Sequence, residues 1–360
     1  MIPYGRQHVD DDDIAAVVAV LKSDWLTRGP AVDDFEARIC EVTGARHAVA
    51  FANGTAALHG AAYAAGLGPG DTVYTSPLSF AASANCARYV GAEAAFVDID
   101  PTTLNVDLTL VPDEADGLVA VHYGGLPVDL ARLHRRPRVV IEDAAHAIGS
   151  LTPDGPVGNC AHSDLCCFSF HPVKTVTTAE GGAVTTNDDN LADRLRRFRH
   201  HGIIDDPEGG GWAYDIPELG YNYRLTDVQC ALGTSQLGKL ERFVTRRNEL
   251  AERYRELLGG EPRIILPPAA PEGWRHAYHL FAVQVPDRER IYDGLHAQDI
   301  RVQVHYVPTY RLSAYREQGW DPAQFPRTED VYGGLLSLPL FPDLTDAEQD
   351  RVVTILLGLL

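Results

Sequence analysis

The sequence predicts an α/β protein whose mostly parallel sheet is covered by helices on both faces. Short apolar runs alternate with helical patterns from about residue 47 onward, which is typical of such a sheet. Polar side chains directly follow several of these runs, as at the carboxyl ends of parallel strands, where ligands bind. The chain has 360 residues and so exceeds one minimal domain. We therefore expect a large domain with an N-terminal arm at 1–240 and a smaller α/β domain at 241–360.

The elements of the first half follow from local patterns. Acidic residues at Asp10–Asp13 suit the positive end of a helix dipole and begin a helix that continues to Leu21. A turn at Arg28–Pro30 precedes a second amphipathic helix. Apolar runs predict strands at 48–52, 72–75, 94–98, 118–121, 138–141, 165–169 and 183–186. Helices are expected between strands at about 55–65 and 81–90.

The second half of the chain begins with a segment of less regular sequence pattern. Residues 205–223 are rich in Gly, Pro and aromatic residues and are expected to form a long irregular loop. A helical stretch follows at 224–258, with interruptions expected near Gly233 and Gly238. The C-terminal part is expected to contain a strand at 278–285, a helix at 288–298, a strand at 301–304, a loop at 305–310 and a final amphipathic helix at 346–359.

The segment Leu165–Val184 holds the strongest chemical signal. Its first strand gives out at His171, before a proline, and Lys174 follows in the loop that leads to a second short strand. Only three of the 31 basic residues are lysines, and we interpret the other two, Lys22 and Lys239, as solvated surface charges. A lysine in a tight loop between buried strands can have its pKa controlled, as a Schiff-base lysine requires. The alternative is a loop lysine whose ammonium group reaches water.

Two further features each allow a functional and a structural interpretation. The free N–H groups of the helix that begins after Asn53 would attract an anion, with the Thr55 hydroxyl as another donor. An ordinary N-cap at Thr55 explains the same pattern. Asp143 ends a buried strand, where its carboxylate needs a partner such as a protonated pyridine nitrogen. It could equally cap the following turn.

Composition excludes several classes of protein. The net charge of -19 argues against binding of nucleic acid, although a local pocket could still bind an anionic small molecule. The six cysteines form no CxxC pair, which indicates small buried side chains in a reducing cytosol and no metal site. No secretory signal and no apolar run of about 18–20 residues occur. We therefore expect a cytoplasmic protein that does not span a membrane.

An ordered set of motifs points to a family. From Tyr4 to the C-terminus, the chain resembles the DegT/DnrJ/EryC1/StrS sugar aminotransferases, which are PLP enzymes of fold type I with an aspartate-aminotransferase-like fold. The motifs that carry the resemblance are WLTRGP (25–30), NGTAAL (53–58), VIEDAAHAIGS (140–150), FSFHPVKTVTTAEGGAV (168–184), GYNYRLTDVQCALGTSQL (220–237) and QVHYVPTY (303–310).

The resemblance implies roles around the cofactor, PLP in one half-reaction and PMP in the other. Lys174 would hold PLP covalently and move a proton between the sugar carbon and the cofactor. Asp143 would partner the pyridine nitrogen, His146 would lie near the ring hydroxyl, and Phe80 would stack on the ring face.

The resemblance also implies how the cofactor phosphate is held. Thr55, Ala56 and Ser169 would bind it from one subunit, and Asn222 would reach it from the neighbouring subunit. The protein is therefore expected to be a homodimer with shared active sites.

The motifs at 168–184 and 303–310 most resemble the aminotransferases that act on C4 of a UDP-4-keto-6-deoxy-N-acetylhexosamine in pseudaminic acid synthesis. The function expected is transfer of an amino group from glutamate to the C4 keto group of such a nucleotide sugar (UDP-4-amino-4,6-dideoxy-N-acetyl-β-L-altrosamine transaminase-like). The residues that would contact the sugar nucleotide are Tyr4, Trp25, Leu26, Thr27, His305 and Tyr306.

Other activities within the same resemblance stay open. The substrate could be another nucleotide keto sugar, of the UDP-aminoarabinose type or linked to dTDP, because YNYRLTD is not identical to the pseudaminate type. A PMP-dependent sugar dehydratase is opposed by Lys174, since those enzymes carry histidine at that position. A PLP-binding protein without catalysis is opposed by the complete set of Lys174, Asp143 and Ser169.

Overall fold

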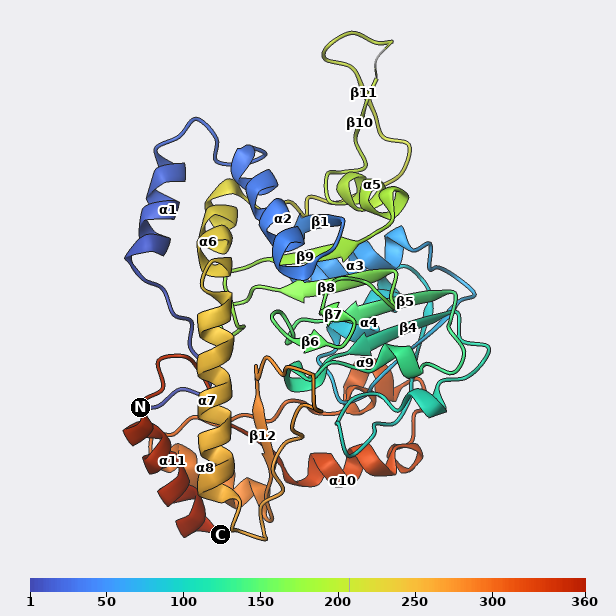
Figure 1. Ribbon diagram of the computed structural model, residues 1–360. Coiled ribbons are helices and arrows are strands. Elements are labelled where there is room, and N and C mark those ends of the chain that lie inside the picture. The colour runs from blue at the N-terminus through green and yellow to red at the C-terminus, as the bar shows by residue number, and fades with distance from the viewer. Residues whose placement is uncertain (207) are drawn as a thin grey trace.

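The computed structural model describes residues 1–206 and 208–360. Its central feature is a seven-stranded sheet in the order β1-β9-β8-β5-β4-β2-β3 (Figure 1). The strands are β1 (His47–Phe51), β2 (Thr72–Thr75), β3 (Glu93–Phe96), β4 (Gly117–Val121), β5 (Val139–Asp143), β8 (Leu165–Ser169) and β9 (Gly182–Thr186). Six of them run in the same direction, whereas β9 runs antiparallel to its two neighbours, β8 and β1. The predicted α/β fold with a mostly parallel sheet is confirmed.

Helices cover both faces of this sheet because successive side chains of a strand point in opposite directions. Val49 packs in the core that α3, α4 and α5 cover, whereas Ala48 and Ala50 pack in the core beneath α2 and α6. The helices of this part are α1 (Asp11–Leu21), α2 (Pro30–Thr43), α3 (Gly54–Ala64), α4 (Ala82–Tyr89), α5 (Asp189–Phe198), α6 (Asp227–Leu237) and α7 (Leu240–Leu258). Short elements are β6 (Leu151–Thr152), β7 (Gly155–Pro156) and the 3-10 turns η1 (Leu108–Leu110), η2 (Tyr123–Gly125) and η3 (Leu130–Arg132).

A second core lies in the C-terminal part of the chain. It joins apolar side chains of α7, α8, α11, β12 and β13, and Ile2 of the N-terminal arm packs into it. The elements here are β12 (Phe281–Gln284), α8 (Arg288–Ala297), η4 (Thr309–Arg311), α9 (Ser313–Arg316), η5 (Pro322–Gln324), α10 (Pro326–Gly334), β13 (Leu335–Leu338) and α11 (Asp346–Leu359).

The prediction of a strand at 301–304 is wrong. Only one bridge forms there, between Gln303 and Ser337, and the antiparallel partner of β12 is β13, which was not expected. Ile300 and Val302 are both fully buried. The alternating pattern therefore records burial of these side chains and not pairing of the backbone.

The interruption expected near Gly233 is also wrong, whereas the one at Gly238 is confirmed. Gly233 lies inside α6, and Gly238 separates α6 from α7. A Cβ atom on Gly233 would lie 2.4 Å from Cε2 of Phe35 on α2. The glycine is present because α2 and α6 pack too closely there for any side chain.

Lys239 is not the solvated surface charge that we expected. Its ammonium group contacts Asp10 and lies 2.9 Å from the carboxylate of Asp13, which is fully buried. Asp13 also accepts hydrogen bonds from Ser235 and Gln236 (2.6 and 2.8 Å). Lys239 therefore ties α1 to the end of α6.

The loop expected at 205–223 is partly regular. The strands β10 (Ile204–Asp205) and β11 (Tyr214–Asp215) pair in a short hairpin that projects from the body beyond α5 (Figure 1). The expectation also covered residue 207, which lies outside the described residues. Trp212 and Leu219 are each 85% exposed. The projecting arm therefore carries large apolar side chains away from the core.

Two kinds of feature are absent from residues 1–206 and 208–360. None of their helices combines the length and the apolar character that crossing a bilayer would take. No group of three or more His, Cys, Asp and Glu side chains among them is arranged to hold a metal ion.

Candidate active site

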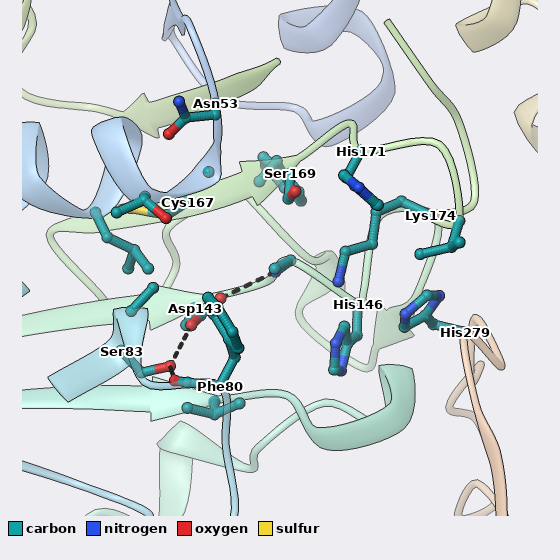
Figure 2. Close-up of a pocket in the computed structure, with 18 of the residues that line it drawn as sticks. Asn53, Phe80, Ser83, Asp143, His146, Cys167, Ser169, His171, Lys174 and His279 are labelled. Atoms are coloured by element: carbon teal, nitrogen blue, oxygen red, sulfur yellow. Dashed lines mark hydrogen bonds between the residues drawn. The ribbon is translucent and has the colours of Figure 1, made fainter. Parts of the chain in front are cut away.

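A cavity of about 360 Å³ opens at the carboxyl ends of β4, β5 and β8 (Figure 2). Nine of the residues predicted from the sequence line it together: Tyr4, Thr55, Phe80, Asp143, His146, Ser169, Lys174, His305 and Tyr306. They come from the N-terminal arm, from the sheet and its loops, and from the C-terminal part of the chain. The fold thus gathers side chains that lie up to 302 residues apart in the numbering.

Lys174 occupies the loop after β8, where its N–H group donates to the His171 carbonyl (2.9 Å). Figure 2 shows its side chain pointing into the cavity toward His146. Burial lowers the pKa of the Lys174 amine to about 8, and the carboxylate of Asp143 opposes that shift. About a tenth of the amine is therefore neutral, and nucleophilic, at pH 7, far more than for a solvated lysine.

Asp143 ends β5 and is only 6% exposed. One carboxylate oxygen accepts from the hydroxyl of Ser83 (2.6 Å), and the other accepts from the N–H group of Ala145 (3.1 Å). The turn-capping role that we considered is thus present. Each oxygen keeps a further acceptor position, so the carboxylate can also bind a protonated nitrogen in the cavity.

His146 is held as a neutral imidazole. Its Nδ1 atom accepts from the N–H group of Gly124 (3.3 Å), so we assign the proton to Nε2, which donates to the Tyr306 hydroxyl (2.9 Å). Burial and the nearby Lys174 hold the pKa of His146 well below its usual value. The His279 ring packs against it with 4.4 Å between ring centroids. The cavity wall therefore presents an N–H donor with a defined direction.

The start of α3 forms the opposite wall. Asn53 is the N-cap, and its side chain accepts from the N–H group of Ala56 (2.8 Å), so the alternative of a cap at Thr55 is wrong. The preceding N–H groups of the first turn have no partner within the helix. A Cβ atom on Gly54 would lie 2.9 Å from Cβ of Ser169. Glycine thus allows the helix end, Thr55 and Ser169 to surround one small anion.

The mouth of the cavity is aromatic. Phe80 is 61% exposed there, with its ring centroid 6.1 Å from that of Tyr306. The rings of Tyr4 and His305 lie 5.3 Å apart. Burial lowers the pKa of His305 to about 4, so its ring is neutral, and Nδ1 contacts the Ser337 hydroxyl (2.9 Å). Planar, uncharged groups therefore surround the entrance.

Five predicted residues do not line this cavity: Trp25, Leu26, Thr27, Ala56 and Asn222. The N–H group of Ala56 is taken by Asn53. The other four are exposed, and short backbone bridges join Thr27 to Thr226 and Asn222 to His200. In the described chain, these four side chains are therefore not part of the cavity that holds Lys174.

Several lining residues lie outside the set predicted from the sequence, among them Asn53, Ser83, His171, Glu180 and His279. Asn53 lies within a motif that we had quoted, so its capping role could have been found. Ser83 is the second residue of α4, and His279 lies two residues before the apolar strand β12. No local pattern distinguishes these two from neighbouring positions, since only the fold brings them to Asp143 and His146.

Known proteins share this architecture and this chain's length. The Bacillus subtilis spore coat polysaccharide biosynthesis protein SpsC is 36% identical over 373 residues, covering 98% of this chain and 95% of that protein. A Streptococcus pneumoniae protein named as a sugar aminotransferase, in its PMP form, superposes with a TM-score of 0.93 at 28% identity, covering all of both chains. Helicobacter pylori PseC, an aminotransferase involved in the biosynthesis of pseudoaminic acid, gives 0.91 at 29% identity, covering 99% and 98%.

The sheet, with a lysine and an aspartate facing one pocket at its carboxyl edge, defines a PLP-dependent aminotransferase of fold type I. Residues 7–357 match the DegT/DnrJ/EryC1/StrS aminotransferase family. The chain belongs to this family and is a sugar aminotransferase that uses PLP and PMP.

Proposed function

We propose that this enzyme transfers an amino group from glutamate to the C4 keto group of a nucleotide-linked 4-keto-6-deoxy sugar. The observation that carries the proposal is a lysine amine of lowered pKa and a buried aspartate on one cavity, with His305 and Tyr306 at its mouth. The similarity to PseC supports a substrate of the pseudaminate type. An aminoarabinose-type or dTDP-linked keto sugar would fit the same cavity chemistry and is the alternative.

The residues present fit PLP. The unpartnered N–H groups at the start of α3, with Thr55 and Ser169, suit its phosphate, and Phe80 suits its ring face. Asp143 suits the pyridine nitrogen, and the Nε2–H group of His146, which donates to Tyr306 here, would turn to the ring hydroxyl. Lys174 would hold the cofactor through its Nζ atom. When bound, PLP acts as an electron sink that takes up an amino group from the donor and delivers it to the keto sugar.

The side chains then have separate tasks. Asp143 keeps a proton on the group it faces, because its carboxylate is fixed by Ser83 and Ala145. Lys174 takes up and returns a proton at Nζ, since a pKa of about 8 lets the amine exist in both forms near neutral pH. The neutral rings of His146 and His305 place no competing positive charge beside that amine.

We also propose a homodimer in which each cavity is completed by the partner. Asn222, Trp25, Leu26 and Thr27 are exposed outside their own cavity, as expected if they act in the other one. The division into domains at residue 240 and a cytoplasmic location stay predictions of the sequence.

The absorption spectrum of the purified protein tests the proposal. Glutamate should bleach the visible cofactor band, and only the correct member of a panel of UDP- and dTDP-4-keto-6-deoxy sugars should restore it. Borohydride reduction followed by peptide mapping should find the cofactor on Lys174. A cofactor attached elsewhere would contradict the site, and loss of water from the sugar without amine transfer would identify a dehydratase instead.

A further inference from the structure

A second cavity, of about 260 Å³, lies apart from the one that holds Lys174 and shares no lining residue with it. It lies between the start of α2, the end of α5 and the segment that precedes α6. Its lining is strongly basic for a chain with a net charge of -19. The lining residues are Arg28, Gly29, Val32, Asp33, Arg196, Arg199, His200, Arg224 and Leu225.

Two of the four arginines have carboxylate partners. Arg199 contacts Glu36 and donates to the Ala50 carbonyl (2.8 Å), so it is part of the packing between α2 and β1. Arg196 pairs with Asp193 one turn away on α5 (3.2 Å). The positive charges of these two guanidinium groups are therefore already balanced by carboxylates.

Arg28 and Arg224 are not compensated. Among the described residues, neither guanidinium group has a carboxylate within 4.0 Å, although Asp33 also lines the cavity. Arg224 donates to Nδ1 of His200 (2.7 Å), and burial together with Arg28 and Arg224 lowers the pKa of that imidazole, which keeps it neutral. Arg224 thus donates one of its N–H groups to an uncharged acceptor.

Among the described residues, one buried hydrogen-bond donor at this cavity also has no acceptor. In the part of the chain that the structure describes, the Nε–H group of Arg224 is shielded from solvent and has no acceptor. Burial and the neighbouring Arg28 and Arg199 lower the pKa of Arg224, so a bound anion would favour its charged form. A buried unpaired donor costs free energy unless a ligand satisfies it.

The turn that presents Arg28 is rigidly held. Asp227 accepts the N–H groups of Gly29 and Ala31 (2.9 and 3.2 Å). Arg28 itself has a φ angle of 59°, in the left-handed region that non-glycine residues rarely adopt. The backbone that carries Arg28 is therefore fixed, and the Arg28 and Arg224 side chains both line the cavity.

We propose that this cavity is a binding site for a phosphate or diphosphate anion, held chiefly by Arg28 and Arg224. Two guanidinium groups offer forked N–H donors that match phosphate oxygens, and a dianion balances both positive charges where a single carboxylate would not. A bridge joins His200 of this site to Asn222, which we expect to act in the partner's cavity. One source is therefore the diphosphate of a nucleotide sugar bound by the partner, which rests on the proposed function. The other source is free phosphate or pyrophosphate.

Calorimetric titration of the holoenzyme with inorganic pyrophosphate tests the site. The double variant Arg28→Gln/Arg224→Gln should lower the affinity by about tenfold or more, because charge-assisted hydrogen bonds are lost. Arg28→Lys/Arg224→Lys should retain part of it. Arg290→Gln, which removes an exposed guanidinium paired with Asp287 on α8, should change nothing. If the double variant fails to fold, Arg28→Gln alone keeps the test, since that side chain is exposed.

Kinetics distinguish the two sources. A raised KM for the nucleotide sugar, with the glutamate half-reaction unchanged, would identify the substrate diphosphate. Weakened pyrophosphate binding with an unchanged KM for the sugar would identify a free anion as the ligand. This conclusion would hold even if the enzyme proved to use another substrate. Unchanged pyrophosphate affinity and KM in the double variant would overturn the site. An effect on glutamate alone would also overturn it, because the ligand would then be a carboxylate.

Discussion

The reactivity of the site depends on the protonation state of one amine, that of Lys174. Its pKa is lowered from 10.5 to about 8, so the neutral form predominates above about pH 8 and the ammonium form below it. Only the neutral amine is a nucleophile. We expect the rate of PLP uptake by the apoenzyme to rise up to about pH 8 and then level off, as measured by stopped-flow absorbance.

The carboxylate of Asp143 raises the pKa of Lys174, in opposition to burial. In Asp143→Asn the midpoint of the uptake profile should therefore move to lower pH. A profile that keeps rising toward pH 10 would show that Lys174 behaves as a solvated lysine.

Ser83 lines the same cavity and contacts the same aspartate. Its hydroxyl donates to Asp143 (2.6 Å) and fixes one carboxylate oxygen. Ser83→Ala should weaken PLP binding by about tenfold, which corresponds to loss of one hydrogen bond to a charged group. Equilibrium dialysis of the apoenzyme measures this directly. Ser83→Thr keeps the hydroxyl and should bind PLP nearly normally, whereas equal losses in both variants would mean that only side-chain volume matters.

Among the elements, the close packing of α2 against α6 depends on the absence of a side chain at Gly233. A Cβ atom on Gly233 would lie 2.4 Å from Phe35 and 2.7 Å from Thr178. Gly233→Ala should therefore destabilise the protein by about 1–3 kcal/mol through overpacking, despite the better helix propensity of alanine. Denaturant unfolding measures the change.

The matched control is Gly333→Ala in α10, where nothing lies within 4 Å of the added methyl group. There the substitution should be neutral or stabilising by up to about 1 kcal/mol. A similar loss at both positions would show that the close approach of Phe35 is not what requires glycine at 233.

Element prediction succeeded where one local pattern decides the outcome. The strands at 72–75 and the final helix at 346–359 have the expected bounds, because apolar periodicity and capping residues lie within the segment itself. It failed at 301–304 and 335–338, where pairing is decided by a partner distant in sequence. It also failed for Lys239, since only the tertiary structure brings Asp10 and Asp13 to that ammonium group.

In the molecule as a whole, the same contrast between local and distant determinants explains which site residues could be predicted from the sequence. Lys174, Asp143 and the start of α3 lie at the ends of predicted strands, so the topology of a parallel sheet already implies that they meet. His279 and Ser83 could not be predicted, because their positions at His146 and Asp143 depend on how the loops and the C-terminal part fold back. Asn222 and residues 25–27 do not line the cavity of their own chain, which is the observation behind the proposed shared site.

Mixing two impaired variants, one altered at Lys174 and one at Asn222, tests whether the partner completes the site. In a heterodimer of Lys174→Ala and Asn222→Ala subunits, shared sites would put both lesions in one cavity and leave the other with an intact Lys174 and an intact Asn222. Activity should then return to about half that of the wild-type dimer, because one of two sites is whole. If Asn222 served its own chain, each cavity would carry one lesion, and the mixture would never exceed the Asn222→Ala enzyme. Re-association of differently tagged subunits, purified on both tags and assayed for amine transfer, separates these outcomes. A mixture of either variant with itself is the control, since subunit exchange alone cannot restore activity there.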